Sequence, residues 1–266
     1  MYYFGLGGDG TDTAYSLECD WNYNNNFDPK QYESIKSESI NTFIIDNVIP
    51  VPDGTVHPGE TANILSGFSV NNLVLRKSNL NYISFPTIEN MNGKDLKVLT
   101  FIDSELNKVR PIGIYLSNFE HFRKFDQVKA IHISGGSFKS MVNQFLSDSV
   151  ANVVSMTVDN TGLQEITTTA FLKFSKLKML TITRNSITKL DWLKNLPSGS
   201  PLWYLDLRNN LISEFPLDLA EKLNKLKVLK LGGNNIHIIG KQTAYTLINQ
   251  LREISFKSYP GIIFLV

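Results

Sequence analysis

Apolar residues recur with one spacing in three stretches of the chain. Each stretch reads L-x-x-L-x-L-x-x-N-x-I, with isoleucine or leucine at the third apolar position, and the stretches are Leu177–Ile187, Leu202–Ile212 and Leu226–Ile236. Alternating apolar and polar residues predict a short strand in each, because successive side chains of a strand point to opposite faces. Leu180 and Ile182 would then face one side of the strand, and Thr181 and Thr183 the other.

Weaker copies of the same pattern extend toward both ends of the chain. Four complete copies, with Ser, Gly or Thr in place of the asparagine, are Val70–Leu80, Leu96–Leu106, Val128–Phe138 and Val153–Leu163. Ile40–Ile45 and Leu251–Phe256 match only the strand part and predict a first and a last strand. A single unit cannot bury its own apolar face, so neighbouring units must stack to form a continuous core.

The spacing resembles that of the leucine-rich repeat, whose period is about 20 to 29 residues. The asparagines of the three strong copies are 25 and 24 residues apart, and the resemblance covers roughly residues 40–260. It implies an α/β solenoid, a leucine-rich repeat horseshoe with a parallel concave sheet and with short helices, 3-10 turns or loops on the convex side. We expect residues 1–35 to form an N-terminal leader or partial cap. Residues 36–266 would form a solenoid of about eight to nine units, irregular before residue 150.

The resemblance also implies structural roles for particular residues. In leucine-rich repeats the asparagine amide bonds to backbone groups of the turn, and stacked turns form a ladder, which here would contain Asn185, Asn210 and Asn234. The first half of the chain lacks these asparagines, so the ladder is in doubt there. The segment 170–177, A-F-x-x-F-x-x-L, resembles the return of the animal-type repeat, and Pro216–Leu223 predicts a short helix. A further phenylalanine set is predicted to lie in the convex-side core: Phe119, Phe122 and Phe125.

Composition and charge limit the classes of partner. A hydrophobic content of 42% supports a folded chain, and a net charge of +1 gives no reason to expect nucleic acid or an anionic membrane as partner. No run of 18 apolar residues occurs, so we expect no transmembrane segment. Met1–Leu6 lacks the basic residues and the apolar run of a secretory signal.

The single cysteine bears on the compartment. Animal extracellular leucine-rich repeats usually carry a cysteine cap at each end, and Cys19 lies where the last cysteine of an N-terminal cap would fall. The resemblance therefore makes Cys19 a disulfide candidate and the chain a fragment of a longer extracellular protein. The alternative is a cytoplasmic protein with an ordinary free thiol. The absence of any N-x-[ST] glycosylation site favours that alternative.

No motif in the sequence predicts catalysis. Gly5–Gly10 matches G-x-G-x-x-G, but the dinucleotide site needs a strand before it and a helix after it, so we expect a flexible leader instead. The histidines are not paired at metal-ligand spacing, and one cysteine cannot build a thiolate zinc site. A lysine cluster is expected to be solvated surface: Lys222, Lys225, Lys227 and Lys230. We therefore predict no catalytic residue, no metal, no cofactor and no enzymatic activity.

The outward residues of the strands would form one concave face, which solenoids use for binding. Within this face we predict a partner-binding site made of Asp159, Thr181, Thr183, Tyr204, Asp206, Arg208 and Lys230. Tyr204, Asp206 and Arg208 are its most suggestive part, because tyrosine and arginine dominate interface hot spots. The alternative is that Asp206 and Arg208 only neutralise each other on a hydrated sheet.

Together, these features predict a protein–protein recognition module that binds a protein ligand through the concave face. The resemblance implies a secreted protein or a receptor ectodomain. An intracellular leucine-rich repeat adaptor is the alternative. A second alternative is a non-catalytic subunit of a secreted enzyme complex, because asparagine-poor repeats of this kind are similar to secreted arthropod leucine-rich proteins.

Overall fold

The structure is a computed structural model that describes residues 2–6, 14–20, 39–46, 68–78, 94–106, 126–141, 147–255 and 263–264. The chain divides into two compact units. Unit 1 contains Met1–His132 and Leu146–Ser149, and unit 2 contains Ile133–Phe145 and Val150–Val266.

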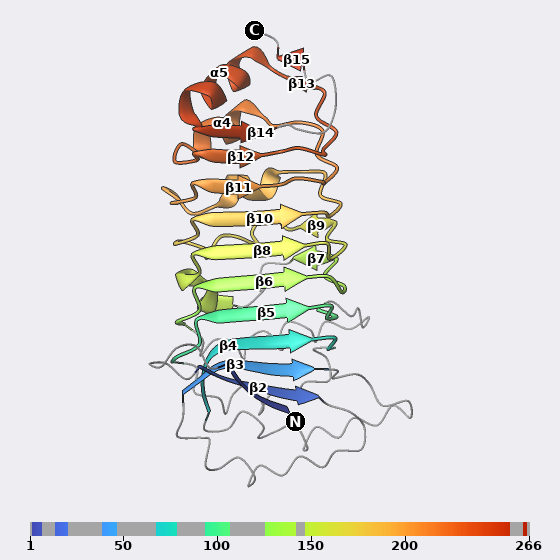
Figure 1. The fold of residues 1–266 in the computed structure, drawn as a ribbon. Helices are drawn as coiled ribbons and strands as arrows, with labels where there is room; N and C mark the ends of the chain where they lie inside the picture. Colours follow the sequence, from blue (N-terminus) through green and yellow to red (C-terminus); the bar gives the residue numbers. More distant parts are fainter. Residues whose placement is uncertain are drawn as a thin grey trace. The chain divides into compact units, whose positions relative to one another are not determined.

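The sheet of unit 1 begins before the first strand that the repeat pattern predicts. Its strands, in spatial order, are β1 (Tyr2–Leu6), β2 (Ala14–Asp20), β3 (Ser39–Asp46), β4 (Ser69–Arg76) and β5 (Val98–Ile102) (Figure 1). β1 is antiparallel to β2, whereas each later strand is parallel to the one before it. The expected flexible leader is therefore wrong at Gly5, which lies in β1 opposite Tyr15. Cys19 lies in β2, beside Ile45 of β3.

Unit 2 contains the regular repeats. Its parallel strands follow one another in space as β8 (Ser155–Asp159), β10 (Met179–Thr183), β11 (Tyr204–Asp206), β12 (Val228–Lys230) and β14 (Glu253–Ser255) (Figure 1). Strand β6 (Ala130–Ser134) contributes residues to both units. All nine strands that the pattern predicts are thus present within the described residues, from β3 to β14.

The core of unit 2 is built from the inward residues of these strands. Met156, Leu180, Leu205 and Leu229 stand at matching positions of four neighbouring strands, and each is 0% exposed. Burying one such side chain stabilises the fold by about 2 kcal/mol, and a row of them requires the neighbouring repeats to be present. The alternation of apolar and polar residues therefore correctly predicts which side of each strand is buried.

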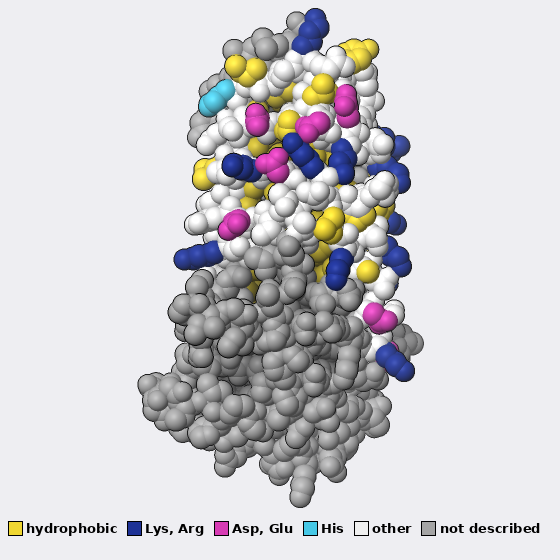
Figure 2. All heavy atoms as spheres, turned by 180° about the vertical axis from the view of Figure 1, so that it is seen from behind, with side chains coloured by type: hydrophobic (Ala, Val, Ile, Leu, Met, Phe, Trp, Pro, Cys, Tyr) yellow, Lys and Arg dark blue, Asp and Glu magenta, His cyan; other side chains and the backbone are white. Residues whose placement is uncertain are grey.

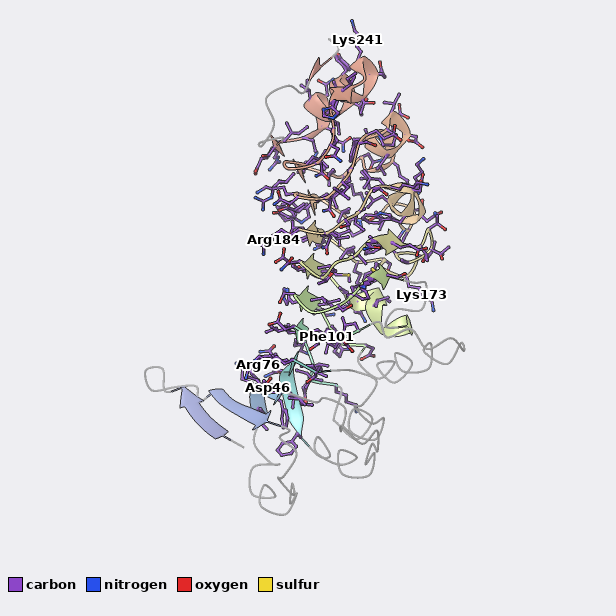
Figure 3. All side chains as sticks on the ribbon, turned by 90° about the vertical axis from the view of Figure 1, so that its right-hand side faces the viewer. Asp46, Arg76, Phe101, Lys173, Arg184 and Lys241 are labelled. Atoms are coloured by element: carbon purple, nitrogen blue, oxygen red, sulfur yellow. The ribbon has the colours of Figure 1, made fainter. Side chains whose placement is uncertain are left out.

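Short elements of different kinds return the chain behind the sheet. They are β7 (Ser140–Met141), η4 (Ser147–Asn152), β9 (Glu165–Ile166), η5 (Asp191–Asn195), α4 (Leu217–Lys222), β13 (Ile238–Ile239), α5 (Lys241–Gln250) and β15 (Ile263–Phe264). In unit 2 the helices lie on the side opposite the open face of the sheet (Figure 3). α4 begins after Pro216, as predicted, and buries Leu219. Phe171 and Phe174 are fully buried in the return before β10, whereas Phe119, Phe122 and Phe125 lie outside the described residues.

A left-handed residue marks the turn after the strand in seven repeats. These residues, with φ between 48° and 71°, are Lys77, Asp103, Gly135, Asn160, Arg184, Asn209 and Gly233. Each stands one residue before the position that carries asparagine in the strong copies. Glycine and asparagine tolerate this conformation, whereas Arg184 and Lys77 adopt it at a steric cost. The turn geometry is therefore shared by repeats whose sequences differ.

The repeat asparagines bond across neighbouring turns. Asn185 Oδ1 accepts from the backbone N–H groups of Thr161 and Leu163, each at 3.0 Å, and its Nδ2 donates to the carbonyl oxygens of Val158 and Thr183. Corresponding bonds reach back from Asn210 to Ile187 and Ile182, and from Asn234 to Ile212 and Leu207. The asparagine amide thus supplies hydrogen-bond partners for backbone groups of the turn, where the chain leaves the sheet and its backbone partners are lost.

Serine takes over part of this role in unit 1. Ser104 Oγ accepts from the backbone N–H of Ser78 at 3.2 Å. It lies 2.9 Å from the carbonyl oxygen of Ile102 and 3.2 Å from that of Leu75, and it can donate its single hydrogen to one of these two groups. A hydroxyl therefore links these two turns, although it offers fewer bonds than an amide.

Candidate protein-binding surface

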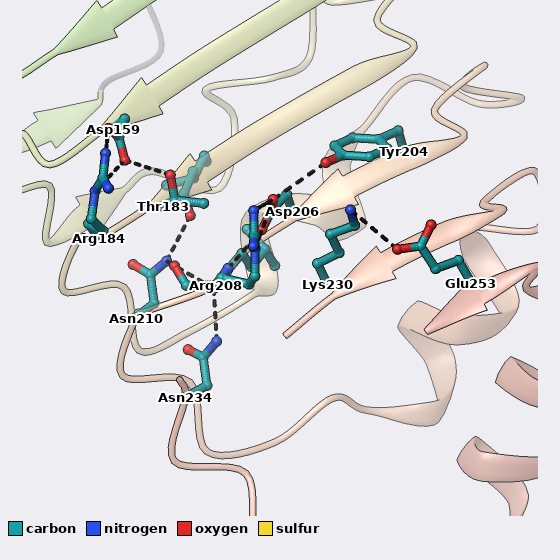
Figure 4. Close-up of polar contacts among 12 residues, drawn as sticks. Asp159, Thr183, Arg184, Tyr204, Asp206, Arg208, Asn210, Lys230, Asn234 and Glu253 are labelled. Atoms are coloured by element: carbon teal, nitrogen blue, oxygen red, sulfur yellow. Dashed lines mark hydrogen bonds and ion pairs between the residues drawn. The ribbon is translucent and has the colours of Figure 1, made fainter. Parts of the chain in front are cut away.

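The outward residues of unit 2 form three rows across the sheet. Register places Tyr204 beside Met179 and Val228, and Asp206 beside Thr181 and Lys230. Asp159 lies beside Thr183 at the ends of β8 and β10. The seven predicted residues therefore come from adjacent strands or from the turn that follows. Figure 4 shows six of them on one side of the sheet, and register places Thr181 beside Asp206.

A buried carboxylate organises the centre of this surface. The side chain of Asp206 is only 2% exposed and that of Arg208 is 49% exposed. Arg208 donates to Asp206 from Nε at 2.9 Å, from Nη2 at 2.7 Å and from its backbone N–H at 3.1 Å, and the Tyr204 hydroxyl lies 3.4 Å from the same carboxylate. The hydrogen bond with Asp206 raises the pKa of Arg208 above its usual value. Several charge-assisted bonds satisfy this buried carboxylate and hold the guanidinium in place.

Alternation predicts the correct face for Asp206 but not its burial. The side chains of Tyr204 and Arg208 bond to it from the same strand and the following turn, so the residue is 1% exposed. Tyr204 and Arg208 are therefore the more exposed members of this group, and Asp206 holds them in place.

Lys230 and Glu253 extend the surface toward the last described repeat. Lys230 Nζ lies 3.2 Å from a Glu253 carboxylate oxygen and 5.5 Å from the centre of the Tyr204 ring. The hydrogen bond with Glu253 raises the pKa of Lys230. Glu253 is absent from the predicted site, although the same alternation in Leu251–Phe256 places it on the outward face. The alternation that predicts the other outward residues therefore extends to Glu253.

A second ion pair lies at the ends of β8 and β10. Arg184 bonds to Asp159 through Nη2, and through Nε at 3.0 Å, while the Thr183 hydroxyl donates to Asp159 at 2.7 Å (Figure 4). The Arg184 side chain is 62% exposed. Strand alternation missed Arg184 because it occupies the left-handed turn position, with φ 54°. Unit 1 has a similar pair on adjacent strands, in which Arg76 Nη2 lies 2.6 Å from Asp46 Oδ2 (Figure 3).

The Asp159 pair predicts an acid-dependent loss of stability. Burial raises the pKa of Asp159, but hydrogen bonds from Arg184 and Thr183 and the Arg184 charge outweigh burial and lower it. A lowered folded-state pKa stabilises the fold above the unfolded pKa of about 3.9, and this stabilisation is lost as pH falls through the folded value. We expect Asp159→Asn to lower the free energy of unfolding at pH 7 by less than about 1 kcal/mol. Urea titrations at several pH values would show the difference vanishing in acid; a difference that persists at pH 2 would contradict this electrostatic account.

Other kinds of site find no support in the residues that can be described. No group of three His, Cys, Asp or Glu side chains among them could hold a metal ion. No helix in the same part of the chain is long and apolar enough to cross a membrane. The disulfide role of Cys19 stays a prediction.

Parallel strands in register, buried leucine rows and amide-linked turns together define a leucine-rich repeat solenoid. Among solved structures, the chain is similar to one in the complex of TLR13 with ssRNA13, at 16% identity and a TM-score of 0.65, over 90% of this chain and 32% of that one. It is also similar to a chain in the octameric complex of Latrophilin 3 (Lec, Olf), Unc5D (Ig, Ig2, TSP1) and FLRT2 (LRR), at 18% identity and a TM-score of 0.60, over 92% of this chain and 76% of that one. This chain thus spans about a third of the TLR13 chain.

These similarities establish the fold and leave the family open. No protein-family model matches the chain, and no curated protein matches its sequence. The narrower resemblance to secreted arthropod proteins therefore has no support from sequence comparison.

Proposed function

We propose that this chain is a recognition module that binds a protein through the outward face of the unit 2 sheet. The observation that carries the proposal is the arrangement of Tyr204, Arg208, Arg184 and Lys230, whose neighbouring carboxylates hold them in place. Arginine and tyrosine provide large contact areas with polar ends, and preorganised side chains lose less conformational entropy on binding.

The charges of this surface indicate the chemistry of the partner. The Asp206 carboxylate is buried and that of Asp159 is 18% exposed, whereas the side chains of Arg184 and Arg208 are largely exposed. Although Glu253 is more exposed than Lys230 at the third pair, 54% against 24%, cationic groups lie outermost at these two arginine pairs. A protein surface with carboxylates placed around an apolar contact would complement them.

A protein partner also agrees with one of the similar structures, which was solved as a multi-protein complex containing FLRT2 (LRR). The TLR13 structure contains RNA, which makes RNA the competing ligand class. On the outward face a carboxylate pairs with each of Arg184, Arg208 and Lys230, which disfavours RNA on this face. We further propose that the chain is a part of an extracellular protein or receptor ectodomain, with Cys19 in its N-terminal cap; an intracellular adaptor remains the alternative.

Site-specific cross-linking tests the proposed face. A photo-cross-linking phenylalanine analogue would replace Tyr204, and in a matched control it would replace Tyr245, which is 65% exposed on α5. Both variants would be screened against a displayed library of extracellular protein domains. The proposal expects a specific adduct through position 204 that position 245 does not give. Adducts through position 245 alone would contradict it.

Once a partner is identified, single substitutions measure the energetic role of the surface. We expect Tyr204→Ala and Arg208→Ala each to weaken binding by about 2 kcal/mol, because each removes a preorganised hot-spot side chain. Titration calorimetry would give the affinities, and Tyr245→Ala provides the control. If variants with normal circular dichroism spectra bound with unchanged affinity, this surface would not be the binding site.

A further inference from the structure

A row of cationic side chains runs along the edge of unit 2 where the strands begin. We call it the strand-start row. It consists of the residues that immediately precede β10, β11, β12 and β14: Lys178, Trp203, Lys227 and Arg252. Backbone bonds tie it together, from Trp203 N–H to Lys178 oxygen at 3.0 Å, from Lys227 to Trp203 at 2.8 Å and from Arg252 to Lys227 at 2.8 Å. Equivalent positions of adjacent repeats thus place these residues side by side.

More lysines lie beside this row. Lys176 and Lys225 precede Lys178 and Lys227 by two residues, in the sequence Lys-Leu-Lys that occurs in both repeats. Figure 2, which views the molecule from behind, shows Lys and Arg side chains gathered along one edge over the C-terminal repeats. Lys178 and Arg252 are distant in the chain from the lysine cluster that the sequence predicts, Lys222 to Lys230, and they join it only because the repeats stack.

The cations at this edge have no carboxylate partner among the described residues. Lys176 Nζ bonds to the amide oxygen of Asn152 at 2.6 Å, and Lys225 and Lys227 bond to backbone carbonyl oxygens. Glu253, which follows Arg252, pairs with Lys230 on the outward face. The α4 residues Glu221 and Lys222 add one charge of each sign nearby. The edge therefore carries an uncompensated positive charge, although the whole chain is nearly neutral.

Spacing makes these charges act together. Adjacent strands lie about 4.8 Å apart, so the Lys178 and Lys227 backbones are separated by about 10 Å. This is close to the Debye length of about 8 Å at physiological ionic strength, so the fields of neighbouring cations overlap. Like charges on adjacent strands also repel one another, and a bound polyanion would remove this repulsion.

Trp203 identifies the edge as more than a solubilising surface. Its side chain is 39% exposed within the row, and its ring lies against that of Tyr204, with a centroid separation of 5.8 Å. An exposed indole between lysines offers an apolar platform on which the face of a sugar ring or a base can stack. A linear ligand with anionic groups along its length would contact the platform and the cations at the same time.

Two features favour a sugar polymer over single-stranded nucleic acid. Nucleic-acid sites of this kind use aromatic side chains on which successive bases stack, whereas the row offers one platform. Its charges are mostly lysines, which bind anions as point charges, while arginine forks are preferred for phosphate recognition. We propose that the strand-start row binds a linear sulfated polysaccharide, with Trp203 contacting a sugar ring and the flanking cations contacting sulfate groups.

A heparin decasaccharide is the probe for this proposal. Binding to the full chain would be measured by titration calorimetry over a range of sodium chloride concentrations, beginning at 50 mM. We expect Lys178→Gln/Lys227→Gln to weaken binding about tenfold or more at the lowest salt concentration. The double substitution should also reduce the slope of log affinity against log salt concentration by about one unit for each cation removed. Trp203→Ala should weaken binding several-fold with little change in that slope.

The control changes the same charge elsewhere in unit 2. Lys189→Gln/Lys241→Gln removes two exposed lysines from the return side, and we expect an affinity within about twofold of the unaltered protein. An equal loss in both double variants would overturn the assignment to this row, as would absence of decasaccharide binding at 50 mM salt. An oligothymidylate of equal charge that binds as tightly as the decasaccharide, or more tightly, would identify nucleic acid as the ligand and overturn the polysaccharide. The lysine variants change neither Tyr204 nor Arg208, so their result is independent of the protein-binding proposal, whereas Trp203→Ala removes a ring contact of Tyr204 and is not used to separate the two proposals.

Discussion

Replacing Asn185 with alanine is expected to lower the free energy of unfolding by about 4 kcal/mol. The Asn185 amide is the partner of the buried backbone N–H groups of Thr161 and Leu163, and it also bonds to the Thr161 hydroxyl at 3.1 Å. Alanine would leave both N–H groups buried without an acceptor, and each such group costs about 1–3 kcal/mol. The loss is large because the replaced side chain serves the preceding repeat as well as its own.

Urea unfolding followed by circular dichroism would measure this loss. Asn235→Ala is the matched control, since Asn235 is exposed and its backbone N–H would still bond to the Ile212 carbonyl oxygen. We expect the control to change the free energy of unfolding by less than about 0.5 kcal/mol. Similar losses for both variants would show that the Asn185 bonds contribute little to the fold.

The ladder connects the stability of the fold with the candidate binding surface. Asn185 Nδ2 bonds to the carbonyl oxygen of Thr183, and these two residues enclose Arg184, whose backbone is left-handed. The amide therefore fixes a turn that would otherwise be strained by a non-glycine residue. Arg184 in turn bonds to Asp159 on the outward face. On the proposed function, binding through Arg184 should therefore depend on Asn185, which is buried beneath the surface.

The sequence predicts the strands of this fold well because the repeat makes one local pattern occur many times. The inward residues Leu180 and Leu205 are buried as the alternation requires. β1 and β2 escape prediction because they do not match the repeat, and β1 is stabilised by antiparallel pairing that no local period reveals. Serine bonding in unit 1 is similarly hidden, since Ser104 resembles any surface serine until the neighbouring turn is placed against it.

The candidate surface is less predictable than the fold for a physical reason. Alternation determines the direction of a side chain, but the exposure of that side chain depends on what lies over it. Asp206 points outward and is nevertheless buried by Arg208 and Tyr204. Arg184 reaches the surface from a turn, where the period of two residues no longer applies. Residues in turns and at strand edges must therefore be placed by three-dimensional contact, and the strand-start row is a further example.

The second large effect is expected at Phe171, which joins the returns of two consecutive repeats. Its ring is 0% exposed and lies 5.0 Å, centre to centre, from the rings of both Phe174 and Trp192. Phe174 precedes β10, whereas Trp192 follows it in η5. Phe171→Ala removes the central ring and leaves a cavity between the repeats, which should lower the free energy of unfolding by about 4 kcal/mol. Leu172→Ala, at a side chain that is 49% exposed, should cost less than about 1 kcal/mol.

Equilibrium unfolding of the Phe171 variant should also report how the repeats are coupled. Each repeat of a solenoid contacts only its neighbours, so stability depends on the interfaces between them. The cavity at Phe171 would weaken one interface, and we expect the denaturant transition to become broader as well as earlier. With Trp21 and Trp203 replaced by phenylalanine, so that Trp192 alone reports, fluorescence should change before circular dichroism. If fluorescence and circular dichroism gave the same transition, with the same midpoint as the Leu172→Ala control, the repeats would be coupled through their strands alone. A broadened transition would instead show that this aromatic contact couples the neighbouring repeats. The same coupling keeps the outward residues of successive strands together in the candidate binding surface.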